Sequence, residues 1–323
     1  MAAVRLLGHA ALLFLLVANA APSKRAELDL IKDSQPHFAL DSLVLGKSKR
    51  RDFLGNHYYY FVFQKWADQY VSDAMQRNGG EWEGFLNRLL EYQVQQETRL
   101  TGKSPHSLVV VDVGANLGSF TLYAASLGCN VRAFEMQPLV YTVLEMGIRL
   151  SGYQKHCHLF NEAVWNSTRE ITFTPTKKNF GNTWIDSRTD KGGGEVKMTS
   201  KRLDEVISDK NIFFLKLDVE GVEEWALRGF DSYINAKRVK HIAVGDSGLF
   251  HSALYKWLYG VGYRCRNYGP VSSSNLPLQD CEKHDAFPAS CTWKTFHDLE
   301  TALAKITNGH LNVFCTMQTH SSS

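Results

Sequence analysis

The middle of the chain alternates short apolar runs with segments of helical periodicity. Leu108 to Val111 is a fully apolar run, typical of strands that are buried on both faces of a parallel sheet. Mostly apolar runs follow at 131–134, 158–160, 212–217 and 241–244, and helical patterns occupy 119–127 and 139–150. This alternation predicts an open α/β sheet joined by right-handed crossovers. Over 168–200, β-prone residues and a triple-glycine turn at 192–194 predict a hairpin insertion.

Helical periodicity also precedes the sheet. Apolar residues recur in steps of three and four over 66–75 and again over 82–94, and Asn78-Gly79-Gly80 lies between the two stretches. The pattern predicts two amphipathic helices that pack over the sheet edge or cover the site. We therefore expect a helical N-terminal extension over 52–104, built onto one α/β domain over 105–323.

Residues 1–20 have the pattern of a secretory signal peptide. Arg5 precedes an apolar run over 6–17, and Ala18-Asn19-Ala20 fits the small-x-small cleavage rule. Because the run is shorter than the about 20 residues that span a bilayer, we expect cleavage after Ala20, no membrane span afterwards, and a location in the secretory-pathway lumen or outside the cell. An uncleaved signal anchor is the alternative. Residues 21–51 are polar and basic, which is typical of a solvated leader or of a propeptide cut at 47–51.

Composition and charge narrow the class of protein. Of the 323 residues, 44% are hydrophobic, which is enough for a sizeable core. Lys and Arg number 36 against 33 Asp and Glu, so the net charge of +3 supplies no broad field for nucleic acid, and we expect no nucleic-acid partner. A small molecule or a glycan is the expected partner. The pattern does not indicate an oligomeric state.

The cysteines acquire a meaning from the predicted compartment. Four of the six lie in the last fifth of the chain: Cys265, Cys281, Cys291 and Cys315. In an oxidising compartment they predict disulfides that hold a loop-rich tail against the last strand, with the pairing left open and buried free thiols as the alternative. Asn166-Ser167-Thr168 is a glycosylation sequon and predicts a surface loop there.

A glycine loop follows the first strand of the predicted sheet. Gly114 and Gly118 allow a tight turn there and leave space for a ligand against the backbone. Glu135 lies 21 residues beyond Gly114, at the end of the second strand, where an acidic side chain accepts hydrogen bonds from ribose hydroxyls. The loop lacks the G-x-G-x-x-G spacing of dinucleotide sites, and Asp112 would repel a pyrophosphate. We therefore expect S-adenosylmethionine rather than NAD.

Three blocks of sequence resemble the methyltransferase FkbM family. They are Asp112-Val-Gly-Ala-Asn-Leu-Gly-Ser-Phe, Ala133-Phe-Glu-Met-Gln-Pro and Phe214-Leu-Lys-Leu-Asp-Val-Glu-Gly-Val-Glu, and they occur in the family's order. The resemblance implies a class I methyltransferase (Rossmann-like) fold, which is a parallel sheet with one antiparallel strand and helices on both faces. It also implies an S-adenosylmethionine site. Its residues would be Asp112, Gly114, Asn116 and Gly118 around the methionine part, Glu135 at the ribose, and Glu162 and Ala163 near the adenine.

The end of the fourth strand carries the candidate catalytic carboxyls. Methyl transfer is an in-line displacement, so the protein must hold the acceptor close to the methyl carbon, and a hydroxyl acceptor must also lose a proton. We expect Asp218 to act as the general base or to orient the acceptor. Glu220 either joins Asp218 in the cleft or has a structural role at the Glu220-Gly221 turn.

These observations predict an exported S-adenosylmethionine-dependent O-methyltransferase. The resemblance implies an oxygen acceptor, which we expect to be a hydroxyl of a glycan or of a small polyhydroxylated molecule. Because the cofactor is made in the cytosol, a non-catalytic secreted binding protein with the same fold is the alternative, and an NAD-linked oxidoreductase is the third reading. Neither H-E-x-x-H nor C-x-x-C occurs, so we expect no metal.

Overall fold

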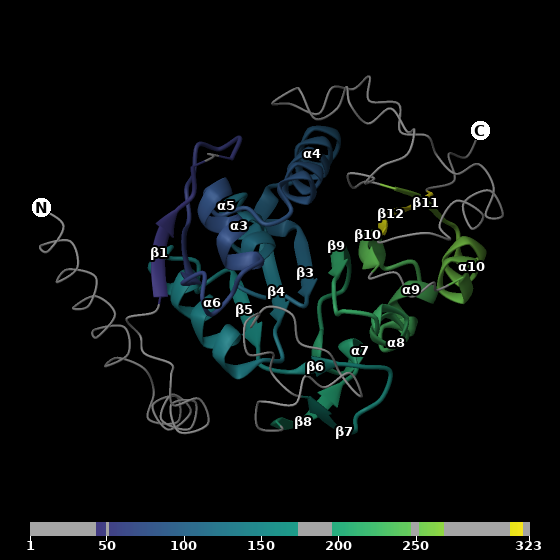
Figure 1. Ribbon diagram of the computed structural model, residues 1–323. Coiled ribbons are helices and arrows are strands. Elements are labelled where there is room, and N and C mark those ends of the chain that lie inside the picture. The colour runs from purple at the N-terminus through teal and green to yellow at the C-terminus, as the bar shows by residue number, and fades with distance from the viewer. Residues whose placement is uncertain (1–42, 50–51, 174–195, 247–251, 268–310, 319–323) are drawn as a thin grey trace, which may run out of the picture.

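A computed structural model describes residues 43–49, 52–173, 196–246, 252–267 and 311–318. Its central sheet has seven strands (Figure 1): β3 (Val109–Val113), β4 (Asn130–Phe134), β5 (Cys157–Phe160), β9 (Ile212–Leu217), β10 (Val239–Asp246), β11 (Tyr263–Asn267) and β12 (Leu311–Met317). Each of the five predicted strands overlaps a strand of this sheet, and β9 has the predicted bounds.

The strand order creates a crevice at one edge of the sheet. The order is β11-β12-β10-β9-β3-β4-β5, with β9 parallel to β10 and β3, and β4 parallel to β3 and β5. β12 is antiparallel to both β10 and β11, so the expected single antiparallel strand is confirmed. From β3 the chain first builds outward through β4 and β5, and it later builds in the other direction through β9 and β10. Ligands of open α/β sheets bind at such a switch point, outside the carboxyl ends of the strands.

Helices cover both faces of the sheet. In Figure 1, α5 (Ser119–Ser126) and α6 (Pro138–Leu150) lie on one side, and α7 (Leu203–Val206), α8 (Glu223–Arg228), α9 (Asp231–Asn235) and α10 (Ser252–Val261) lie on the other. A short 3-10 helix, Pro105–Ser107, precedes β3. Val110 belongs to the core on the first face and Val111 to the core on the second, because successive strand side chains point to opposite faces. Burial on both faces explains the apolar runs.

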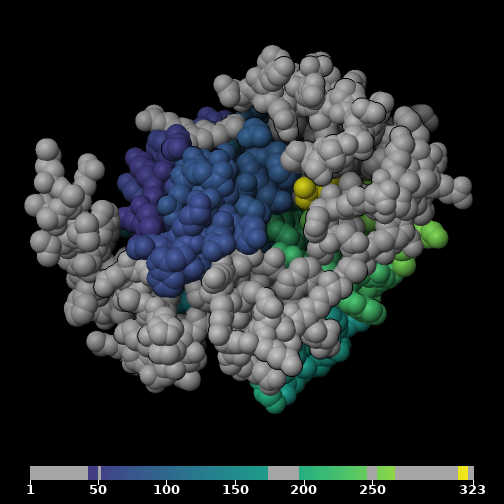
Figure 2. Space-filling view, viewed as in Figure 1, coloured from purple at the N-terminus to yellow at the C-terminus, as the bar shows by residue number. Residues whose placement is uncertain are grey.

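The N-terminal extension shares the core of the first face. α3 (Val71–Asn78) and α4 (Gly84–Thr101) are the two predicted helices, and Gly79 ends α3 in the left-handed conformation, at φ 70°. Met75 and Leu90 are fully buried in the same core as Phe120 of α5. Figure 2 shows the extension, in purple and blue, along one side of the molecule.

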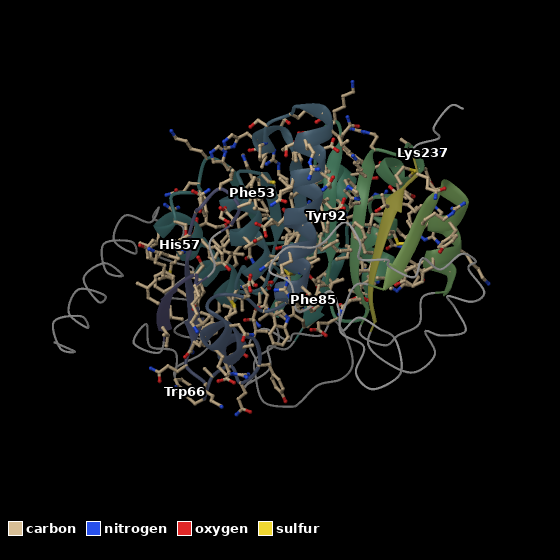
Figure 3. The ribbon with its side chains drawn as sticks, turned by 90° about the horizontal axis from the view of Figure 1, so that it is seen from above. Phe53, His57, Trp66, Phe85, Tyr92 and Lys237 are labelled. Atoms are coloured by element: carbon tan, nitrogen blue, oxygen red, sulfur yellow. A yellow bond between two sulfur atoms is a disulfide. The ribbon has the colours of Figure 1, made fainter. Side chains whose placement is uncertain are left out.

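The sequence predicted a helical extension over 52–104, but the extension also contains two strands. β1 (Leu43–Lys47) pairs antiparallel with β2 (Tyr59–Phe63), which lies within the aromatic stretch before the helices. Pairing with β1 satisfies the backbone of this stretch while Phe61 and Phe63 are buried. Trp66, which the periodicity includes in the first helix, lies before α3 and is 54% exposed (Figure 3).

The insertion is a hairpin, as predicted. β7 (Glu170–Phe173) pairs antiparallel with β8 (Val196–Lys201), and β6 (Ala163–Val164) pairs parallel with β8, so the three strands form a small second sheet. The glycine turn at 192–194 lies outside the described residues. Asn166 of the sequon is half-buried in the turn that joins β6 to β7.

One predicted disulfide is present. Cys265 of β11 and Cys315 of β12 lie opposite each other and are bonded, whereas Cys129 and Cys157 are buried free thiols. Cys281, Cys291, the signal peptide and the leader up to residue 42 lie outside the described residues. Within the described ranges, no helix has the length and apolar character needed to cross a membrane.

Candidate functional site

A cleft of about 620 Å³ opens at the switch point of the sheet. Its walls come from the loop after β3, the end of β4, the segment after β5 and the loop after β9. The lining residues are Val113, Gly114, Asn116, Phe134, Glu135, Met136, Glu162, Ala163, Val164, Asp218, Val219, Glu220 and Val222. Seven of the nine residues predicted for the site therefore line one cleft. The other two, Asp112 and Gly118, do not line it.

The two loop glycines have different functions. Gly114 has φ 79°, and a Cβ at this position would lie 1.9 Å from the carbonyl oxygen of Asp218. The absence of a side chain therefore lets the loop after β3 approach the end of β9. Gly118 has φ 85°, and its Cβ would lie 2.1 Å from Cδ1 of Leu144, so this glycine lets α5 pack against α6. Gly114 shapes the cleft, whereas Gly118 supports it from behind.

Glu135 connects the end of β4 to the glycine loop. Its carboxylate accepts hydrogen bonds from the backbone N–H of Asn116 and of Gln137, each at 2.8 Å. Burial raises the pKa of Glu135 to about 7, although the two N–H groups favour the charged form. The residue predicted to hold a ribose thus lines the cleft and also fixes the conformation of the loop.

Glu162 presents an unsatisfied oxygen at the cleft. Its Oε2 is buried and has no hydrogen-bond partner among the described residues. The neighbouring Asn161 amide donates to the carbonyls of Glu135 at 2.9 Å and Met136 at 3.1 Å, which holds this segment against the end of β4. A buried carboxylate oxygen without a donor is unfavourable, so the position fits a ligand that brings an N–H or O–H group.

Asp112 is fully buried behind the glycine loop. Its Oδ1 lies 3.1 Å from Nζ of Lys216, and its Oδ2 accepts a hydrogen bond from the Thr121 hydroxyl at 2.6 Å. Lys216 also donates to the carbonyl oxygen of Gly114 at 3.1 Å. Burial opposes the lysine charge, but the nearby carboxylates outweigh it and raise the pKa of Lys216. Asp112 therefore acts on the cleft by holding a cation under the loop.

Asp218 and Glu220 both line the cleft. Oδ2 of Asp218 lies 3.6 Å from Nζ of Lys216. Desolvation raises the pKa of Asp218 and is opposed by the Lys216 ammonium. Desolvation and the charge of Asp218 raise the pKa of Glu220 to about 7. Glu220 has φ 55°, an unusual conformation for a residue with a side chain, and this turn directs it to the cleft.

Glu223 has the structural role that was considered for Glu220. Its Oε1 accepts hydrogen bonds from the backbone N–H of Gly221 at 3.0 Å and of Val219 at 3.3 Å. A carboxylate is also favourable in the first turn of α8, near the positive end of the helix. Glu220 is thereby left available to the cleft.

Sequence reasoning missed one acidic residue of this site. Glu83 lies at the start of α4, and it lines a neighbouring cavity of about 360 Å³ together with Lys216 and Asp218. Burial, followed by the charge of Asp218, raises the pKa of Glu83 to about 8. The sequence offered a weak signal, a carboxylate at the start of the predicted helix over 82–94, but no spacing rule linked it to the glycine loop.

Comparisons with known proteins agree with the geometry. The family described as the methyltransferase FkbM domain matches residues 112–265. "Methyltransferase 1" of Beauveria bassiana is 28% identical over 152 residues, which cover 39% of this chain and 60% of that protein. The "AMB antimetabolite synthetase AmbE" of Pseudomonas aeruginosa is 26% identical over 171 residues, which cover 41% of this chain and 8% of that protein. The chain thus spans less than two thirds of the length of either relative.

A solved structure described as methyltransferase FkbM from Methylobacillus flagellatus is also similar, at 13% identity and a TM-score of 0.39. The likeness covers 78% of this chain and 62% of the other. The family match over 112–265 spans the glycine loop, Glu135 and both carboxyls after β9, and the sheet has the strand directions that the family implies. These residues therefore form a methyltransferase FkbM domain, and the family expected from the sequence is confirmed.

Proposed function

We propose that this protein transfers a methyl group from S-adenosylmethionine to a hydroxyl of a glycan or of a small polyhydroxylated molecule in the secretory pathway. The observation that carries the proposal is the cleft at the switch point. It combines a nucleoside-type half, with Glu135 and Glu162, and an acid–base half at Asp218. The two halves meet where Gly114 brings the loop after β3 against the end of β9.

The residues of the cleft fit the cofactor. The unpartnered oxygen of Glu162 suits the amino group of an adenine, and the Glu135 carboxylate suits ribose hydroxyls. Gly114 has no side chain, and a Cβ at this position would clash with the carbonyl oxygen of Asp218, so the backbone here is open to a ligand. Nothing in the lining resembles a pyrophosphate site, because the lining carries four carboxyl groups.

The proposed chemistry needs little from the protein beyond positioning and a base. S-adenosylmethionine, when bound, supplies an electrophilic methyl group. The acceptor oxygen forms the new C–O bond while the C–S bond breaks, and Asp218 takes the proton that the acceptor hydroxyl loses. A raised pKa makes Asp218 a stronger base, and Lys216, 3.6 Å away, favours the ionised form that can accept the proton.

The acceptor class and the compartment rest on charge, sulfur chemistry and the N-terminal pattern. Glu220 and Asp218 give the acceptor side of the cleft an acidic character, which suits a neutral polyol better than an anion. The Cys265–Cys315 disulfide is compatible with an oxidising compartment. The signal pattern over 1–20 supports entry into the secretory pathway.

A binding titration tests the cofactor. Calorimetry of the mature chain with S-adenosylmethionine, S-adenosylhomocysteine and NAD should show binding of the first two compounds and not of NAD. Glu135→Ala should lower the affinity for both sulfur compounds by about tenfold or more, because it removes the ribose partner and the hydrogen bonds that hold the loop. Glu170→Ala, on the 68% exposed carboxylate of β7, is the matched control and should bind as wild type. A wild-type chain that binds neither sulfur compound would overturn the proposal.

A turnover assay tests the base. With tritiated S-adenosylmethionine and a panel of neutral glycans and polyols, Asp218→Asn should retain cofactor binding and lose methyl transfer by about a hundredfold or more. Asp73→Asn, at a half-buried carboxylate of α3 that pairs with Arg77, should leave transfer unchanged because this residue does not line the cleft. Full transfer by Asp218→Asn would remove this carboxyl from the mechanism.

A further inference from the structure

The second cavity continues the first across the glycine loop. Three residues, Gly114, Asn116 and Asp218, line both cavities. The remaining walls come from the N-terminal extension, the loop after β3, the start of α5 and β9: Val71, Trp82, Glu83, Leu86, Asn87, Ala115, Leu117, Ser119, Phe120 and Lys216. A ligand that occupies the nucleoside half of the cleft can therefore reach into this space beside Gly114. The family match begins at residue 112 and does not include the extension.

Glu83 brings an unpaired anion to this cavity. Within the described part of the chain, no hydrogen bond or ion pair engages its carboxyl. The charged groups that face it are Asp218, Glu220, Asp112 and Lys216, so anionic groups outnumber the single cation. A half-buried carboxylate among other carboxylates is unfavourable, and a ligand cation beside Glu83 would relieve this.

Asn87 brings an unpaired donor, one helical turn after Glu83. The residue is 1% exposed, it lines the cavity, and its Nδ2 has no hydrogen-bond partner among the described residues. Glu83 is the residue directly before α4, the helix marked by Phe85 and Tyr92 in Figure 3, and Asn87 lies in its first turn, so both side chains line the same cavity. A buried amide without an acceptor is unfavourable, so the position fits a ligand that brings an oxygen.

The two groups together match a zwitterion. The Glu83 carboxylate favours a cation. The Asn87 amide, with Lys216 in the same wall, favours an anion. The positive end of α4 also favours a negative group nearby. An α-amino acid group has an ammonium and a carboxylate on one carbon, and a neutral hydroxyl acceptor has neither.

We propose that the start of α4 binds the amino-acid end of the cofactor, with Glu83 accepting hydrogen bonds from its ammonium and Asn87 donating to its carboxylate. This inference rests on the proposed function, because it needs S-adenosylmethionine as the ligand. It makes the N-terminal extension part of the cofactor site and leaves the part of the first cleft beside Asp218 and Glu220 to the acceptor. The ammonium neutralises the excess of carboxyls that the chain alone leaves in the cavity.

Two ligands that differ in the amino-acid end test the inference. S-adenosylhomocysteine has this end, and methylthioadenosine is the nucleoside without it. In wild type, S-adenosylhomocysteine should bind more tightly. Glu83→Gln should lower the affinity for S-adenosylhomocysteine by about tenfold or more and keep the affinity for methylthioadenosine within about twofold of wild type. The reason is that a hydrogen bond to a charged group is lost for one ligand alone. Asn87→Leu, which keeps the branched shape of the side chain and removes its hydrogen-bonding groups, should likewise weaken the binding of S-adenosylhomocysteine alone.

Matched controls separate the outcomes. Glu170→Gln removes the same charge far from the cavity and should bind both ligands as wild type, and thermal melting without ligand should show all variants folded. If Glu83→Gln and Asn87→Leu lower the affinity for both ligands equally, or for neither, the inference is overturned while the proposed function stays intact. A wild-type chain that binds neither ligand would instead overturn the proposed function.

Discussion

Gly114 is the residue at which the loop after β3 meets the end of β9. Its φ of 79° and the 1.9 Å between a built Cβ and the Asp218 carbonyl oxygen impose two separate constraints on this position. The first constraint is conformational and applies to any residue with a side chain. The second is steric, and it concerns backbone atoms that cannot rotate away. Gly102 meets the first constraint alone, since it has φ 69° and no atom lies within 4 Å of its built Cβ.

We therefore predict different effects for alanine at the two glycines. Gly102→Ala should lower the free energy of unfolding by about 1–2 kcal/mol, the conformational term. Gly114→Ala should lower it by a further about 1–3 kcal/mol, because the loop must move away from β9, and it should abolish binding of S-adenosylhomocysteine. Urea unfolding and calorimetry measure the two effects. Equal losses of stability would mean that the approach of the two backbones is not constraining.

At the scale of elements, the sheet is joined at its amino edge independently of the site. Arg132 of β4 forms a two-pronged contact with Asp209, which precedes β9, with Nε to Oδ2 at 3.0 Å and Nη2 to Oδ1 at 2.8 Å. Both side chains are mostly buried, at 17% and 18% exposed. Such planar pairs are stronger than surface ion pairs, and lysine cannot reproduce their geometry.

Breaking this contact should reduce stability without affecting the cleft. Arg132→Leu leaves Asp209 as an unpaired, mostly buried carboxylate, so we expect a loss of about 1–3 kcal/mol in the free energy of unfolding. Arg132→Lys should lose less, because the charge remains. Affinity for S-adenosylhomocysteine should stay at the wild-type value in both, since neither Arg132 nor Asp209 lines the cleft or the neighbouring cavity. A large loss of affinity would contradict this separation.

At the scale of the whole molecule, the site concentrates acidic groups that are easier to protonate in the folded chain than in the unfolded one. The pKa is raised to about 8 for Glu83 and to about 7 for Glu135 and for Glu220, mainly by burial. Between the unfolded value of 4.5 and these folded values, the folded chain binds more protons than the unfolded chain. The contribution of these three carboxyl groups to the free energy of unfolding is complete below the unfolded pKa of 4.5 and is lost as the pH rises through their pKa values in the folded chain.

The ligand-free protein should therefore become less stable as the pH rises from about 5 to about 8. Melting temperatures across this range measure the effect, and Glu83→Gln should flatten the curve because one of the titrating groups is removed. S-adenosylmethionine should bind more tightly over the same rise, since its positive charges favour the ionised carboxylates. A melting temperature that climbs with pH would show that other groups dominate the linkage.

The sequence by itself determined the fold class and most of the cleft. Strands that are buried on both faces need apolar runs, and ligands of an open α/β sheet bind at the carboxyl ends of its strands, so Gly114, Glu135 and Asp218 could be brought together without coordinates. The hairpin insertion followed in the same way from β-prone residues around a glycine turn. These are local rules, which a linear pattern expresses.

Only the tertiary structure decided which residues reach the ligand. Asp112 is buried with Lys216 behind the loop, and Glu223 rather than Glu220 stabilises the turn. Glu83 and Asn87 enter the site because α4 packs against α5 in a shared core, and β2 is a strand because β1 lies beside it. Contacts between segments far apart in the chain depend on how whole elements pack, and no spacing within the sequence records them.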